Sequence, residues 1–250
     1  TQEHLTDRII EALDLGDAPP ADTPAEEVLV SDKDGDPPNG TYSYKSVIGM
    51  LLYLSGHSRP DIAMAVSQVA RFSHDPKRSH EKALERIGLY LKKTRKKGLI
   101  LRPTKELDVD AYVDTDFAGC ASTRRSTSGG CILIGSCTIK HWSKTQATIS
   151  LSSGEAELHG IAMGCSQGLG IQSLMRDLGW DLKLRVFSDA TAAIGIARRK
   201  GLGKIRHLDC TDLWIQDTIR SGRITLDKVL GANNPADILT KYVEKKALDM

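Results

Sequence analysis

Alternating apolar and polar positions divide the chain into a helical first part and a second part that mixes strands with helices. Three short stretches of the second part have the alternating pattern of half-buried strands, at residues 107–114, 130–134 and 139–143. The pattern then predicts a long helix, a buried strand, two helices, a strand and a last helix, at residues 154–178, 182–188, 190–199, 208–219, 223–229 and 235–243 in that order. This order of elements predicts an α/β domain built on a central mixed sheet.

The first part of the chain has no strand pattern. Residues 5–15 have helical spacing, whereas residues 16–40 are rich in Pro, Asp and Gly and are expected to form a linker or a mobile loop. Residues 43–94 are expected to be all-helical, with Pro60 and Pro76 standing where helices should begin.

We therefore predict a division into three parts. Residues 1–42 form a mixed helix and a Pro/Gly/Asp-rich linker, residues 43–103 form a small all-helical segment, and residues 104–250 form the α/β domain. The chain has 250 residues, of which 40% are hydrophobic and 26% charged, so it can bury a sizeable core and has an ordinary globular composition. Its net charge of +2 excludes a uniformly basic nucleic-acid binder, so any nucleic-acid surface has to arise from local clustering.

Cysteine usage and hydropathy narrow the class of protein further. The five cysteines are odd in number and form no C-x-x-C pair, which favours reduced thiols inside a cell over a disulfide framework or a zinc site. No apolar run reaches the length of a membrane span, so no membrane partner is expected. The chain begins with Thr1 instead of Met, which suggests a piece of a longer chain.

Four short motifs in the second part carry acids at positions where acids are unusual. They are Tyr112-Val113-Asp114-Thr115-Asp116, Ser153-Gly154-Glu155-Ala156-Glu157, Val186-Phe187-Ser188-Asp189-Ala190 and Pro235-Ala236-Asp237-Ile238. Aspartates beside Val, Phe and Ile are costly to bury unless a partner compensates their charge. Mg²⁺ is such a partner, because it takes oxygen ligands of this kind. Four separated carboxylates that converge on one point predict a two-metal phosphodiester hydrolase.

The first two motifs leave alternatives open. Asp114 could be a strand-end acid that faces water, because acids are mostly exposed. Asp116 shares its strand face, so it could be the metal ligand itself or a group that supports the ligand. Glu155 and Glu157 lie two positions apart on a helix and cannot share a face, and the apolar stripe of that helix does not decide between them.

The other candidate residues also have plainer interpretations. Asp189 could be a helix N-cap, and Asp237 could be a first-turn acid that the helix dipole favours. Two basic clusters could contact nucleic-acid phosphates, namely Lys92, Lys93, Arg95, Lys96 and Lys97 after a predicted helix, and Arg124 and Arg125 beside Ser126, Thr127 and Ser128. The alternatives are a solvated helix end for the first cluster and a hairpin turn for the second.

The order of the four acids resembles that of ribonuclease H, and the residues around them resemble the copia-type retrotransposon Pol polyprotein more closely still. The resemblance covers about residues 44–243 and rests on motifs in the family's order: Tyr44 to Gly49, Ser58 to Ala63, Tyr112 to Gly119, Arg124 to Gly129, Leu151 to Glu157, Arg206 to Asp209 and Ala236 to Lys241. Phe117, Leu158 and Ala190 depart from the family pattern, but none of these departures removes a candidate ligand.

This resemblance implies a ribonuclease H-like mixed five-stranded sheet with flanking helices, preceded by a helical thumb or connection segment. It implies endonucleolytic cleavage of the RNA strand of RNA–DNA hybrids, with two Mg²⁺ ions, or Mn²⁺ in their place, held by Asp114, Glu157, Asp189 and Asp237. One ion would activate water and the other would stabilise the leaving 3′ oxygen. The family analogy favours Glu157 over Glu155, because ribonuclease H helices carry a small residue three positions after the catalytic Glu, where Glu157 has Gly160.

The resemblance also implies a context. The upstream polymerase domain of the same polyprotein would be a partner, the location would be a cytoplasmic virus-like particle or the nucleus, and this piece would not polymerise DNA, because the polymerase's aspartate pair is absent. His207 matches a family histidine that assists proton transfer or product release, although a packed or surface histidine fits equally well. Two alternatives stay open: a catalytically silent hybrid-binding remnant of a decayed element, and a DNA-cutting integrase, whose D-D-E order of acids fits the motifs poorly.

Overall fold

The computed structural model of the protein describes residues 1–102, 104–105, 107–201 and 210–248. By its internal contacts the chain forms two compact units. The helical unit consists of Thr1–Leu99, Cys120–Ser122 and Lys241–Met250, and the sheet unit consists of Ile100–Gly119 and Thr123–Thr240. The three-part division drawn from the sequence stays a prediction. No helix in the described part of the chain is long and apolar enough to cross a membrane.

The helical unit is built around one apolar core. Its helices are α1 (Glu3–Ala12), α2 (Tyr44–His57), the 3-10 turn η1 (Pro60–Ile62), α3 (Ala63–Ala70), α4 (Arg78–Lys93) and α8 (Lys245–Leu248). The apolar faces of these helices bury Ile9, Leu51, Ile62, Leu84 and Ile87 completely. Pro60 takes the first position of η1, as the sequence predicts, because its fixed φ suits a helix start.

The segment that joins α1 to α2 has no helix or strand in residues 16–40, but it is held along α4. The backbone N–H of Ala21 donates to the carbonyl of Leu89 (3.3 Å), and Leu29 packs against the core. Asp22 forms an ion pair with Lys93 near the end of α4. The segment is therefore irregular, as predicted, and is anchored by contacts that a free linker would lack.

A buried ion pair ties η1 to the end of α4. The guanidinium of Arg59 donates to both carboxylate oxygens of Asp61 (2.9 and 2.8 Å) and to the carbonyl of Thr94 (3.0 Å). The hydroxyl of Tyr90 donates to Asp61 as well (2.7 Å). Arg59 is 1% exposed and Asp61 8%. This pair explains why the Ser58 to Ala63 motif carries two charged residues that are buried in the helical unit.

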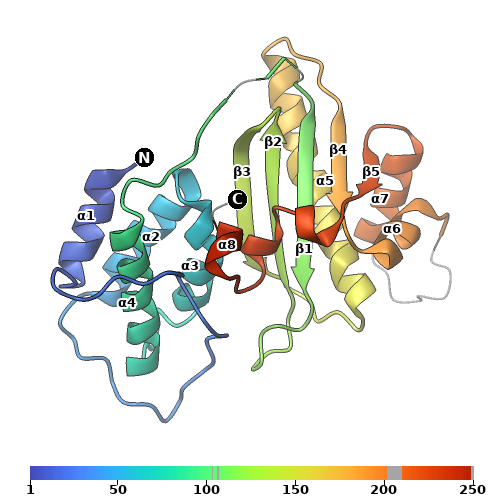
Figure 1. Cartoon of the computed structure of the whole chain (residues 1–250). Coiled ribbons are helices and arrows are strands. Elements are labelled where there is room, and N and C mark those ends of the chain that lie inside the picture. The colour runs from blue at the N-terminus through green and yellow to red at the C-terminus, as the bar shows by residue number, and fades with distance from the viewer. Residues whose placement is uncertain (103, 106, 202–209, 249–250) are drawn as a thin grey trace. The chain divides into compact units, whose positions relative to one another are not determined.

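The sheet unit holds a five-stranded sheet with the strand order β3-β2-β1-β4-β5 (Figure 1). Its elements are β1 (Val109–Asp116), β2 (Thr127–Ile134), β3 (Cys137–Thr145), α5 (Ser153–Asp177), β4 (Leu184–Ser188), α6 (Thr191–Arg198), α7 (Cys210–Arg220), β5 (Thr225–Lys228), and the 3-10 turns η2 (Gly231–Asn233) and η3 (Asp237–Leu239). β2 is antiparallel to β1 and β3, whereas β4 is parallel to β1 and β5 is parallel to β4. The predicted mixed five-stranded sheet with flanking helices is confirmed.

Helix α5 lies along one face of the sheet (Figure 1) and approaches it closely through a row of glycines. Gly160, Gly164 and Gly168 recur every four residues and therefore share one face of the helix. A Cβ at Gly160 would lie 2.5 Å from Oγ1 of Thr115, and a Cβ at Gly164 would lie 2.5 Å from Cγ1 of Val113. Any side chain at either position would push α5 away from β1.

Two predicted elements differ from the structure. The predicted last α-helix at residues 235–243 is wrong, because this stretch contains only the 3-10 turn η3, and α8 begins later, at Lys245. Side chains hold the stretch on the sheet instead: Asn234 donates to the carbonyl of Val113 (3.0 Å) and Thr240 donates to Asp114. Strand β2 begins at Thr127, three residues before the predicted strand at residues 130–134, and the polar side chains at its start are buried.

Candidate active site

The topology of the sheet brings the four acid motifs to one edge. Strands β1, β3, β4 and β5 run in the same direction, because β2 is antiparallel to both of its neighbours and the other pairs are parallel. Their carboxyl ends therefore meet at the same edge of the sheet, where open α/β sheets usually bind ligands. Asp114 lies near the end of β1, α5 starts after β3, Asp189 follows β4, and η3 follows β5.

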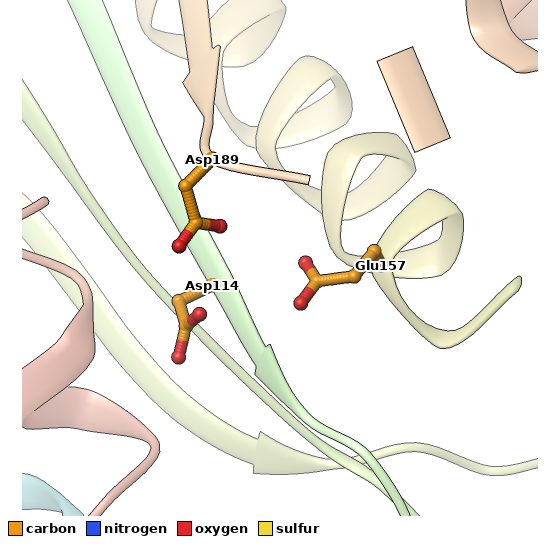
Figure 2. A group of neighbouring side chains, drawn as sticks. All are labelled: Asp114, Glu157 and Asp189. Atoms are coloured by element: carbon orange, nitrogen blue, oxygen red, sulfur yellow. The ribbon is translucent and has the colours of Figure 1, made fainter. Parts of the chain in front are cut away.

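Three acids converge at this edge. One carboxylate oxygen each of Asp114, Glu157 and Asp189 lie within 4.8 Å of one another. Figure 2 shows these carboxylates reaching from β1, from the first turns of α5 and from the end of β4 into a common space. Asp114 is 1% exposed, and the other two are half-buried.

The chemistry of this acid group fits a divalent cation. Three carboxylates at such distances repel one another when all are ionised. A hard cation removes that repulsion, and its preferred ligands are oxygen atoms of this kind. We therefore conclude that Asp114, Glu157 and Asp189 could hold a divalent metal ion.

Asp114 is not a strand-end acid that faces water. The hydroxyl of Thr240, which is fully buried, donates to Oδ2 of Asp114. Gly129 lies opposite Asp114 on β2, and a Cβ at Gly129 would lie 2.6 Å from Cγ2 of Thr240. Gly129, from the Arg124 to Gly129 motif, thus makes the room that Thr240 occupies.

The two glutamates of α5 have different surroundings. Glu155 is buried, its Oε2 accepts a hydrogen bond from the backbone N–H of Leu151 (2.8 Å), and its own N–H donates to Oγ of Ser152 (3.2 Å). These contacts belong to the N-terminal cap of the helix. The structure places Glu157, and not Glu155, beside Asp114 and Asp189; its role as a ligand stays a prediction.

The structure also bears on the alternatives for Asp189, Asp116 and Asp237. Asp189 is not an N-cap, because α6 is capped at Ala190 without a side-chain hydrogen bond. Asp116 turns toward the loop after β1, where a Cβ at Gly119 would overlap its Oδ2. Asp237 is half-buried in η3 and is not one of the three grouped acids, so its role as a fourth ligand stays a prediction.

Comparison with known proteins finds relatives of the kind that the sequence motifs indicate. No family model matches the chain. It is 27% identical, over 259 residues and its whole length, to the retrovirus-related Pol polyprotein from transposon TNT 1-94 of Nicotiana tabacum. It is 31% identical over 207 residues, 82% of its length, to the corresponding polyprotein from transposon RE1 of Arabidopsis thaliana. It is also 35% identical over 168 residues to the uncharacterized mitochondrial protein AtMg00810 of Arabidopsis thaliana, covering 67% of this chain and 69% of that protein.

The chain belongs to the Pol polyprotein family of copia-type retrotransposons. It spans 19% of the TNT 1-94 polyprotein and 14% of the RE1 polyprotein.

Two solved structures are similar to this Pol segment at low identity. LC11-RNase H1, isolated from compost, is 16% identical with a TM-score of 0.39, and the match covers 57% of this chain and 96% of that one. The foamy viral protease-reverse transcriptase in complex with an RNA/DNA hybrid is 12% identical with a TM-score of 0.49, covering 75% and 24%. At these scores it is the sequence relatives, not the solved structures, that define the family.

Most side chains of the basic run at the end of α4 contact other residues of the same chain. Lys92 donates to the carbonyls of Leu15 (3.0 Å) and Ala18 (2.8 Å), and the other contacts are Lys93 with Asp22, Arg95 with Asp7 (2.5 Å) and Glu3 (3.2 Å), and Lys97 with the carbonyl of Leu248. Lys96 is exposed. These partners compete with any phosphate, so the run is a weak candidate for a nucleic-acid contact.

The second basic cluster is arranged differently. Arg124 and Arg125 are both exposed in the loop between β1 and β2. The three hydroxyl side chains that follow them are buried and belong to the fold, namely Ser126, Thr127 and Ser128. His207 and Arg206 lie outside the described residues.

Several residues that support the site were not predicted from the sequence. Thr240 and Asn234 contact β1 directly. Gln146 donates to Oγ of Ser128 (2.8 Å) and to the carbonyl of Ala156 (2.9 Å), and so joins β2 to the first turn of α5. Thr240 lies inside the family motif that ends at Lys241. The motif therefore marked this residue, but it did not indicate the hydrogen bond from Thr240 to Asp114.

Proposed function

We propose that this chain carries the ribonuclease H of a copia-type Pol polyprotein and cleaves the RNA strand of RNA–DNA hybrids. The observation that supports this most directly is the meeting of three acids from three separate acid motifs at one edge of the sheet. The helical unit would be the thumb or connection segment that follows the polymerase domain, and the compartment would be a virus-like particle or the nucleus.

The acids would act by holding divalent metal ions. Asp114, Glu157 and Asp189, with Asp237 as a fourth ligand, would hold two Mg²⁺ ions or Mn²⁺ in their place. Bound ions of this kind activate water for attack and stabilise the leaving 3′ oxygen. The chain supplies fixed ligand positions: Asp114 is buried and hydrogen-bonded, and the row of glycines on α5 keeps Glu157 close to β1.

Two features would direct the substrate to this edge. Arg124 and Arg125 are exposed in the loop that follows the strand of Asp114, where they could contact phosphates. The 2′-hydroxyl of the substrate would distinguish the cut strand from DNA. The grouping of Asp114, Glu157 and Asp189 favours an active enzyme over the catalytically silent remnant, because a decayed site would be expected to lose such acids.

The test is cleavage of an end-labelled RNA–DNA hybrid with and without Mg²⁺, using a matched pair of variants. We expect the wild-type chain to cut only with metal, and E157Q to lose cleavage by orders of magnitude. E155Q should keep most of its activity and lose only about 1 kcal/mol of stability, as for a lost helix cap. A well-folded wild-type chain that does not cut in Mg²⁺ or Mn²⁺ contradicts the proposal. An inactive E155Q beside an active E157Q would reverse the assignment on α5.

A further inference from the structure

The stretch at residues 231–240, which follows β5, is tied to β1 just before Asp114. The side-chain NH₂ of Asn234 donates to the carbonyl of Val113 (3.0 Å), and its Oδ1 accepts the backbone N–H of Ala236 (3.2 Å). Asn234 is 5% exposed. Both ends of its amide are therefore used to place this stretch against the strand that carries Asp114.

Thr240, at the end of the stretch, is held in one position. Its backbone N–H donates to the carbonyl of Asp237 (3.1 Å), so its Cα is fixed by η3. Its methyl group lies over Gly129, where a Cβ would approach to 2.6 Å. The side chain is completely buried, and its hydroxyl lies within hydrogen-bond distance of two acceptors, Oδ2 of Asp114 and the carbonyl of Asp237 (3.2 Å), of which Oδ2 of Asp114 is the nearer.

This hydroxyl is suited to orient a metal ligand. The terminal torsion of an aspartate side chain is broad, so burial alone does not select one orientation of the carboxylate plane. A hydrogen bond from a fixed hydroxyl to one oxygen does select it, and hydrogen bonds to charged acceptors are stronger than neutral ones. The carboxylate of Asp114 is thereby presented to Glu157 and Asp189 in a fixed orientation.

We propose that Thr240 is a positioning residue for Asp114, which acts on metal binding through its hydroxyl. The inference rests on the proposed metal-dependent function of the acid group. Partners that hold a metal ligand from behind typically change metal affinity by about 10–100-fold when they are removed. A Thr240 that served only to fill space would instead act through its methyl group, which packs over Gly129.

The two roles predict opposite orders for two variants. T240V keeps the branched shape and removes the hydroxyl, whereas T240S keeps the hydroxyl and removes the methyl group. If Thr240 positions Asp114, T240V loses metal affinity and T240S stays near wild type. If Thr240 only fills space, T240S is the more damaged of the two, and both bind metal normally once folded.

The experiment measures Mn²⁺ affinity of the full chain from the free-ion signal in electron paramagnetic resonance, without substrate. We expect T240V to bind Mn²⁺ about 10–100-fold more weakly than wild type, and T240S to stay within about threefold. Circular dichroism checks folding, and T240A replaces T240V, with the same expectation, if T240V does not fold. Affinity of the hydroxyl-free variant within twofold of wild type, or an equal loss in T240S, overturns the proposal.

Failure of the proposed function is distinguishable from failure of this inference. A wild-type chain that binds no Mn²⁺ overturns both. A wild-type chain that binds Mn²⁺ but does not cut the hybrid contradicts the proposed activity alone, and the order of T240V and T240S in Mn²⁺ affinity still decides the role of Thr240.

Discussion

Replacing Gly160 by Ala should weaken metal binding and metal-dependent cleavage, with only a small loss in the free energy of unfolding. The added Cβ would lie 2.5 Å from Oγ1 of Thr115, whereas ordinary contact begins at 3.4 Å, so the two must separate by 3.4 − 2.5 = 0.9 Å. Thr115 is 5% exposed on β1, and its branched side chain has few alternative rotamers. The first turns of α5 are therefore expected to move away from the strand.

The magnitude follows from that displacement. Overpacking of this kind costs about 1–3 kcal/mol, and Ala recovers about 1 kcal/mol of helix propensity over Gly, so the net loss of stability is about 0–2 kcal/mol. Glu157 lies one turn before Gly160 and moves with it. A misplacement of about 1 Å can lower the rate of a positioned reaction by about 100-fold. We expect that loss in metal-dependent cleavage, together with weaker Mn²⁺ binding.

Gly164 provides the matched control. A Cβ there meets Cγ1 of Val113 at the same 2.5 Å, but one turn further from Glu157. G164A should therefore lose comparable stability in thermal unfolding and much less metal affinity. The double variant G160A/T115A removes the atom that clashes and should recover most of the lost affinity. Equal losses of affinity in G160A and G164A, or full affinity in a folded G160A, would refute the reasoning.

Two further predictions concern stability and thiol reactivity. R59M leaves the carboxylate of Asp61 buried without its cation, which should destabilise the helical unit by about 3–5 kcal/mol in urea denaturation; an unchanged midpoint would mean that the pair adds nothing. Burial raises the pKa of the Cys131 and Cys165 thiols to about 12, so both stay protonated at neutral pH. Neither should be alkylated by iodoacetamide until the chain unfolds, and rapid labelling of either, detected by mass spectrometry, would contradict their burial.

Much of the fold was predictable because it is encoded locally. The alternation along β1 and the helical period of α5 are properties of neighbouring residues, and both elements lie within two residues of their predicted bounds. Pro60 marks a helix start for the same local reason. The acids Asp114, Glu157 and Asp189 were recognisable because each interrupts an apolar pattern or stands in a motif.

The tertiary structure decided what depends on contacts between distant parts of the chain. The hydrogen bond from Thr240 to Asp114 joins residues 126 positions apart, and no local period encodes it. The same contacts replaced the predicted last helix by η3, since side-chain hydrogen bonds to β1 outweighed helix propensity there. Gly160 already favoured Glu157 over Glu155 in the sequence, but only the packing of that face of α5 against the sheet places Glu157 beside Asp114. The sequence by itself thus determined the elements and the acids, and packing determined which acids meet and what holds them, because burial and hydrogen bonding across the fold are set by the whole chain.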